Sequence, residues 1–308
     1  MNTKYKILLA TDYSEAVMNA ERYAVQFAKA TNSILVFLHI YDTPLPPPKI
    51  TMSYKDMLVN TKAFEIEKLE NHREKLFQTL NIKPGGIAGE CIVREGLAGK
   101  QIRKEAKETD ADFIIVGTHG ATGFREVFFG SHSWDVIKKS SVPVIAVPKE
   151  ALFTGFKNIV FGTEYREGEI PVLNFLTKFA KHFDAEVTVL HSTNYVLSKH
   201  FEKDMFERFR NDIKGKVVYD KIKIELIKSG NVVDGLNRFC ERTKADLLVM
   251  SPQQPYLLEK IFTPDPSMTK KMSFHATTPL MTIPDFYNPE YIDFWKHFAQ
   301  GDYVNEDF

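Results

Sequence analysis

The feature that most constrains the fold of this chain is an internal repeat. Residues 7–13 (ILLATDY) recur as residues 159–165 (IVFGTEY). The correspondence extends over most of the chain through three further pairs of segments: 27–29 with 179–181, 111–116 with 245–250, and 143–148 with 279–284. A chain of 308 residues is long enough to bury two cores. We therefore expect two domains, residues 1–150 and 151–285, followed by an aromatic-rich extension at 286–308.

Each copy alternates strand-like apolar runs with helix-like periodicity. The first helix is expected to begin after Ser14, a residue type that caps helices, and further helices are predicted at 52–80, 100–108 and 133–139. Strands that alternate with helices indicate a doubly wound parallel sheet. In such a sheet ligands bind beyond the carboxyl ends of the strands, where the strand order reverses.

One segment has the outline of a phosphate-binding loop. The apolar run 113–116 is followed by Gly117 and Gly120, and nine residues later by Gly130 and Ser131. Glycines let the backbone approach phosphate groups closely, and a helix that starts near Ser131 would present free N–H groups to an anion. Each of these residues alone also suits an ordinary loop or helix cap, so their joint spacing carries the prediction.

With this motif, residues 1–148 resemble the universal stress protein family, whose ATP-binding members carry the pattern G-x2-G-x9-G-[ST]. The resemblance covers both copies and implies two tandem Rossmann-like domains, of the adenine nucleotide alpha-hydrolase-like type, that form a pseudo-dimer. It also implies ATP, ADP or AMP as the ligand. The site residues carried over are Ala10, Thr11, Asp12, Ile40, Val116, Gly117, His119, Gly120, Gly130, Ser131, His132 and Ser133.

Within this implied site, several roles are more specific. Ala10 and Thr11 would flank the adenine, Ile40 would offer it backbone groups, and Val116 would pack against the nucleotide. Asp12 would bind a ribose hydroxyl or help to hold Mg²⁺, although a turn residue before the first helix is an equally good interpretation. His119 and His132 would lie near phosphates, or be exposed loop histidines without a role.

The second copy departs from the motif. Ser251 stands where Gly117 would be expected, and no glycine occurs between Gly235 and Gly301. The segment 263–267 (TPDPS) replaces the Gly-Ser pair, so prolines remove N–H donors and an aspartate adds negative charge. We therefore expect this half not to bind a triphosphate in the manner of the family.

Composition narrows the remaining choices. Forty basic and forty acidic residues cancel, which argues against nucleic acid as a partner. Without a signal-like or membrane-spanning apolar run, we expect a cytoplasmic protein with no membrane partner. Cys91 and Cys240 have no metal-ligand spacing and are expected to be small buried hydrophobes. The proline-rich stretch 44–48 suggests a stiff loop, and the aromatic extension should dock on the second domain or a neighbouring subunit.

The sequence thus predicts a tandem universal stress protein with one adenine nucleotide site and a regulatory or stress-endurance role. Single-domain members of the family commonly pair through their last strands, so the resemblance implies that 143–147 and 279–283 pair as an intramolecular pseudo-dimer. A homodimer is left open and no protein partner is identified. One alternative is a slow ATP hydrolase, although the P-loop pattern G-x4-G-K-[ST] is absent. Another is a nucleotide-independent scaffold that binds a partner.

Overall fold

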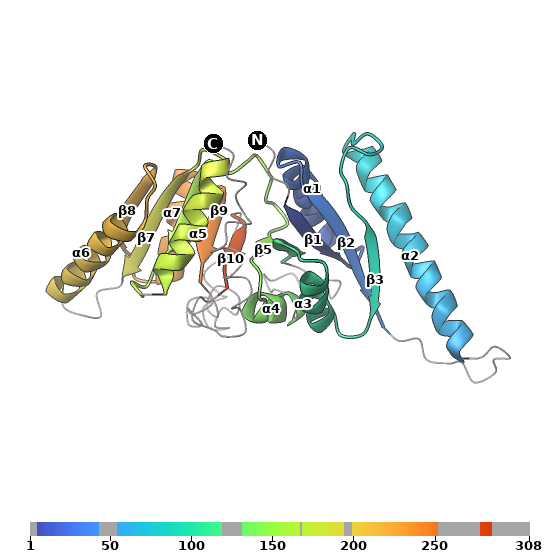
Figure 1. Cartoon of the computed structure of the whole chain (residues 1–308). Helices are drawn as coiled ribbons and strands as arrows, with labels where there is room; N and C mark the ends of the chain where they lie inside the picture. Colours follow the sequence, from blue (N-terminus) through green and yellow to red (C-terminus); the bar gives the residue numbers. More distant parts are fainter. Residues whose placement is uncertain are drawn as a thin grey trace.

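A ten-stranded β-sheet forms the centre of the described structure (Figure 1). The computed structural model describes residues 5–42, 54–118, 131–166, 168–193, 199–251 and 278–284. The strand order is β3-β2-β1-β4-β5-β10-β9-β6-β7-β8. The second half has the same strand order as the first when each is read from its outer edge toward the centre of the sheet. The predicted doubly wound fold is confirmed.

The two halves contribute corresponding elements in chain order. The first half supplies β1 (Lys6–Thr11), α1 (Glu15–Ala30), β2 (Ile34–Tyr41), α2 (Tyr54–Thr79), β3 (Cys91–Glu95), α3 (Ala98–Glu108), β4 (Phe113–Gly117), α4 (Ser131–Lys139) and β5 (Val144–Val147). The second half supplies β6 (Asn158–Gly162), α5 (Glu169–His182), β7 (Glu186–Thr193), α6 (Lys199–Lys216), β8 (Ile222–Lys228), α7 (Val232–Thr243), β9 (Leu247–Met250) and β10 (Leu280–Thr282).

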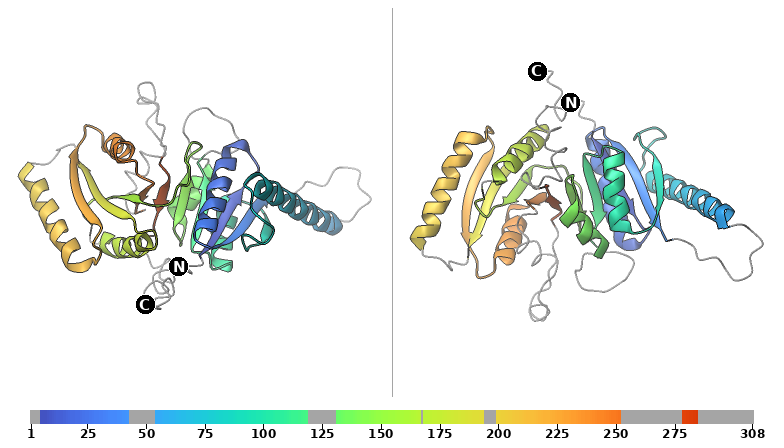
Figure 2. Two further views of the ribbon diagram at one scale, coloured as in Figure 1. Left: turned by 90° about the horizontal axis from the view of Figure 1, so that it is seen from above. Right: turned by 60° about the horizontal axis from the view of Figure 1, so that its bottom comes forward.

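The halves meet through their last strands, as the sequence predicts for a pseudo-dimer. β5 and β10 pair antiparallel, with Ile145 opposite Met281, whereas the other neighbouring strands of the described sheet are parallel. Figure 2 shows these two strands between the halves. Because a single chain supplies both strands, the pairing needs no second molecule.

Alternate strand residues face opposite helical layers. Ile7 and Leu9 of β1 point to the layer formed by α1, α2, α5 and α6, and are fully buried there. Leu8 points to the other layer, formed by α3, α4 and α7. Both apolar clusters continue from one half into the other. The near-continuous apolar runs of the central strands follow from this burial on both faces.

An aromatic cluster ties the halves together on the α1 and α5 side. The ring centroids of Phe113 and Phe179 lie 5.6 Å apart, and those of Phe156 and Phe179 lie 5.2 Å apart. The Tyr5 hydroxyl and His182 Nδ1 form a 2.5 Å hydrogen bond across the same boundary. Burial, together with Lys181, lowers the pKa of His182, which favours the neutral ring in this contact.

Several local expectations need correction. α3 and α4 each begin two residues earlier than the predicted starts at residues 100 and 133. Ser14 occupies the N-cap position of α1, but its side chain makes no capping hydrogen bond. Asp12 Oδ1 instead accepts a 3.0 Å hydrogen bond from the Ser14 N–H. Cys240 is buried as expected, whereas Cys91 is partly exposed.

Some expectations concern segments outside the described residues. These are the proline-rich stretch at 44–48, the glycine loop at 119–130, the altered second-half segment at 263–267 and the extension at 286–308. In the part of the chain that is described, no helix is both long and apolar enough to cross a membrane.

Candidate functional site

The carboxyl ends of β2, β1 and β4 lie side by side in the sheet. Ala10, Ile40 and Val116 come from these three strands, and their side chains all belong to the face covered by α3 and α4. The structure therefore brings these three predicted site residues to one edge and one face. This edge is where doubly wound sheets bind ligands.

Thr11 faces the opposite layer. Its side chain is buried, its hydroxyl donates a hydrogen bond to Glu21 Oε1, and its Oγ1 accepts a 3.1 Å bond from the Tyr13 N–H. A ligand held beside Ala10 could therefore meet the backbone of Thr11, but not its hydroxyl. The prediction that Thr11 flanks the adenine therefore applies to its backbone and not to its side chain.

Asp12 is exposed at the turn between β1 and α1. Its bond to the Ser14 N–H confirms the turn role, while Tyr13 next to it adopts the left-handed conformation, with φ of 61°. Short polar side chains of this kind stabilise such turns through bonds to the backbone two residues on. The ribose or magnesium role of Asp12 stays a prediction.

The start of α4 is fixed against the end of β4. Ser133 Oγ donates a 3.1 Å hydrogen bond to the carbonyl oxygen of Gly117. At Gly117 a Cβ atom would lie 3.3 Å from Val17 Cα, so helix α1 passes unusually close to this strand end. The hydroxyl of Ser133 thus has a protein partner, and its part in phosphate binding stays a prediction.

The remaining predicted ligands cannot be placed. His119, Gly120 and Gly130 lie outside the described residues, as do the side chains of Ser131 and His132. The described geometry still fixes both ends of this loop, since β4 ends at Gly117 and α4 begins at Ser131. The start of α4, where a helix has free N–H groups, therefore lies beside the end of β4.

The sequence analysis missed a polar network on the α1 and α2 side of the same strand ends. Glu21 is fully buried, and both of its oxygens lie 2.9 Å from His72 Nε2. The His39 ring packs against Tyr13 in a tilted arrangement, with 4.3 Å between centroids, and its Nδ1 lies 2.9 Å from the Thr11 carbonyl oxygen. Burial lowers the pKa of His39 and raises that of Tyr13.

The second half repeats part of this network. Thr163 Oγ1 donates to Glu169 and accepts from the Tyr165 N–H at 3.0 Å. His191 Nδ1 lies 2.8 Å from the Thr163 carbonyl oxygen, and its ring stacks on Tyr165 at 4.1 Å. The sequence signal for this arrangement was the recurrence of residues 11–13 (TDY) as 163–165 (TEY) and of 38–39 (LH) as 190–191 (LH).

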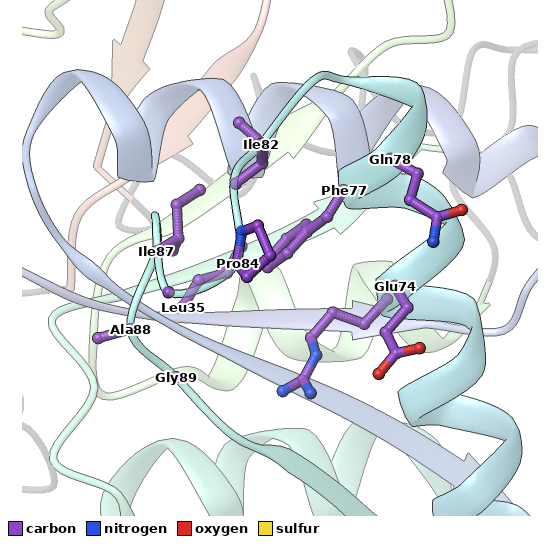
Figure 3. Close-up of a pocket in the computed structure, with 11 residues that line it drawn as sticks. Leu35, Glu74, Phe77, Gln78, Ile82, Pro84, Ile87, Ala88 and Gly89 are labelled. Carbon is purple, nitrogen blue, oxygen red and sulfur yellow. The ribbon is translucent and has the colours of Figure 1, made fainter.

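A separate pocket of about 550 Å³ lies near the start of β2, at the opposite end of that strand (Figure 3). Leu35, Phe77 and Ile87 contribute apolar walls, and Arg73 and Glu74 bring opposite charges to its lining. Its position separates it from the strand-end site. Its mixed charge favours no particular ligand.

The cysteines and acids of the described residues offer no reactive or metal-binding centre. Burial raises the pKa of the Cys91 thiol to about 11 and that of Cys240 to about 12, which keeps both protonated at neutral pH. Within those same residues, no group of three or more His, Cys, Asp or Glu side chains is arranged to hold a metal ion.

The described residues thus form a doubly wound α/β protein in which the carboxyl ends of β2, β1 and β4 and the start of α4 gather at one edge of the first half. The family model of the universal stress protein family matches residues 5–148. The first half of the chain therefore carries a domain of the universal stress protein type.

Sequence relatives agree with this match, and a solved structure shares the fold. The universal stress protein MJ0577 of Methanocaldococcus jannaschii is 29% identical over 163 residues, covering 49% of this chain and 99% of the relative. Universal stress protein Sll1388 of Synechocystis is 29% identical over 151 residues, covering 46% of this chain and 96% of the relative. A universal stress protein structure from Archaeoglobus fulgidus superposes on both halves, with a TM-score of 0.63, 16% identity, and coverage of 91% of this chain and 98% of the other.

Proposed function

We propose that the first half binds one adenine nucleotide, with ATP as the principal ligand, and that this binding serves a regulatory role in the stress response. The observation that carries the proposal is the convergence at one sheet edge of Ala10, Ile40 and Val116 with the two ends of the glycine loop. The apolar side chains can pack against the adenine ring, and the free N–H groups at the start of α4 can bind phosphate oxygens.

The close packing at Gly117 supports the same proposal. Val17 leaves little room for a side chain there, so the chain turns away from the sheet at a fixed point. The Thr118 N–H also donates a 3.2 Å bond to the Val147 carbonyl oxygen, which anchors the departing loop to β5. A loop with both ends anchored loses less conformational freedom when it closes on a ligand.

We propose further that the second half binds no nucleotide. Ser251, which replaces Gly117, is buried. Helix α7 packs directly on Ser192, the counterpart of Ile40, because a Cβ atom at Gly235 would overlap the Ser192 hydroxyl and lie 2.7 Å from Ser229 Cβ. The space that a base would need beside Ser192 is therefore taken by the helix.

The test begins with the purified full-length chain. Denaturation followed by mass spectrometry identifies any bound nucleotide, and calorimetric titration of nucleotide-free protein with ATP gives the stoichiometry. We expect one equivalent of ATP per chain for the wild type and none for Gly130→Val. Gly230→Val is the matched control, because a Cβ atom added at Gly230 would meet no other atom within 4 Å and the residue belongs to the second half. Unchanged affinity in folded Gly130→Val would refute the site.

A further inference from the structure

In the polar network next to the proposed site, His39 and Glu65 face each other with two hydrogen-bond acceptors and no hydrogen between them. His39 Nδ1 faces the Thr11 carbonyl oxygen at 2.9 Å. A carbonyl oxygen only accepts hydrogen bonds, so Nδ1 carries the hydrogen, and Nε2 of the neutral ring is an acceptor. Nε2 lies 3.7 Å from Glu65 Oε2, which is also an acceptor when the carboxylate is ionised.

The surroundings of Glu65 favour a hydrogen bond to His39. Its Oε2 is buried and forms no hydrogen bond with the described residues, although Lys68 Nζ approaches it at 3.6 Å. The side chains of His39 and Glu65 are only 10% and 15% exposed. One added proton would turn two facing acceptors into a hydrogen-bonded pair, and would satisfy a buried oxygen whose isolation is costly.

The second half provides an internal comparison. Its tyrosine and histidine have the same geometry, yet the rings of Phe206 and Phe209 from α6 stand against Tyr165. In the first half His72 and Lys68 of α2 take that place beside Tyr13. The same tyrosine and histidine pair is therefore flanked by aromatic rings in the second half and by His72 and Lys68 in the first.

We propose that His39 and Glu65 share one exchangeable proton, and that its uptake in mild acid strengthens the binding of an anionic nucleotide at the adjacent end of β1. The coupling part of this inference rests on the proposed function. Wherever the proton resides within the pair, its uptake raises the local charge by one unit. His39 contacts Thr11 directly and precedes Ile40 in the chain, so the added charge lies next to two residues of the site.

The charged and polar groups around the pair determine the pH range in which it takes up the proton. Burial lowers the pKa of His39. The hydrogen bond to the Thr11 carbonyl and the negative charges of Glu65 and Asp12 oppose that effect, while Lys68 adds to it. Neutral His39 therefore prevails at pH 7, and protonation belongs to mildly acidic conditions. The titratable groups around the pair and its tyrosine are Asp12, Tyr13, Glu21, Tyr41, Lys68, His72 and Cys91.

Ring-nitrogen NMR on the full chain without nucleotide tests the shared proton. The His39 signal is assigned by its loss in His39→Gln and followed from pH 5 to 8. Glu65→Gln keeps the side-chain shape but removes the charge, so the His39 midpoint should move to lower pH by roughly one unit. Glu67→Gln, an exposed site on the same helix, should leave the midpoint unchanged. Equal midpoints in the wild type and Glu65→Gln would overturn the proposal.

ATP titrations at pH 5.5 and 7.5 test the coupling. The ionisation of ATP itself is common to all variants, so only the ratio of affinities between the two pH values is compared. The wild-type ratio should exceed that of Glu65→Gln by about fivefold, the lower end of coupling between sites, and Glu67→Gln and His191→Gln should match the wild type. Identical ratios in the wild type and Glu65→Gln would overturn the coupling. If no variant binds ATP, the proposed function and the coupling both fail, and the NMR titration alone decides on the proton.

Discussion

The buried ion pair between β3 and α3 gives a quantitative test of how the first half is held together. Arg94 Nε lies 2.6 Å from Glu105 Oε2, and its Nη2 lies 2.9 Å from Oε1, so the contact is bidentate. The Glu105 side chain is 3% exposed and that of Arg94 is 33% exposed. Replacing Arg94 with Met keeps most of the aliphatic packing but leaves the carboxylate without its counter-charge.

The expected loss follows from this burial. Removing one partner of a buried pair costs about 3–5 kcal/mol, and the partial exposure of Arg94 places this variant near 3 kcal/mol. Lys104→Met is the matched control on the same helix. Lys104 and Glu108 are about half exposed, so their pair should contribute less than about 1 kcal/mol. The double variant Arg94→Met/Glu105→Met should recover most of the stability.

The penalty should also depend on pH. Burial raises the pKa of Glu105 even with Arg94 present, and removing Arg94 raises it further. A raised pKa means that folded Glu105 binds a proton more readily than the unfolded chain does, so the penalty is present at high pH and is relieved as the pH falls through the folded value. The difference from wild type should therefore be smaller at pH 5 than at pH 8.

Urea unfolding followed by circular dichroism measures these differences at both pH values. The reasoning would be refuted if Arg94→Met lost no more stability than Lys104→Met at pH 8. A loss that stayed constant between pH 8 and pH 5 would contradict the assignment of the penalty to an unpaired Glu105 carboxylate.

Three further predictions concern stability. Gly89→Ala should cost at least about 2 kcal/mol, because its Cβ would overlap the Leu35 backbone carbonyl, and the urea midpoint would reveal this. Gly215→Ala, with open space around it in α6, should instead stabilise by up to about 1 kcal/mol in the same assay. Tyr5→Phe should cost about 1–3 kcal/mol in thermal unfolding, since His182 loses its partner across the halves; an unchanged melting temperature would contradict this linking role.

The repeat and the strand patterns were predictable because they depend on local apolar runs. Burial on both faces makes segments such as 113–116 apolar throughout, and the parallel order follows from the alternation with helices. The pairing of β5 with β10 was expected from the resemblance to the family, whose single-domain members commonly pair through their last strands. Ala10, Ile40 and Val116 share a face because side chains alternate between the two faces along each strand.

The polar network could not be predicted, because its partners are brought together only by packing. The Thr11 hydroxyl donates a hydrogen bond to Glu21, in the second turn of α1. The Thr163 hydroxyl donates to Glu169, the first residue of α5, so the two carboxylates do not occupy equivalent positions in the repeat. His72 lies far from Glu21 in the chain. The start of α1 after Ser14 was predicted correctly, but the Ser14 hydroxyl makes no capping bond, a detail of side-chain conformation that propensity alone does not decide.

The central claim is that one nucleotide binds, at the strand ends of the first half only. Hydrogen–deuterium exchange of the full chain with and without ATP tests it most directly, because each half supplies equivalent peptides. We predict slower exchange with ATP at residues 10–12, 40–41 and 116–118 and at the start of α4, and no change at 162–164, 192–193 and 250–251. Protection of the second-half strand ends, or of neither half under conditions where ATP is bound, would contradict the account.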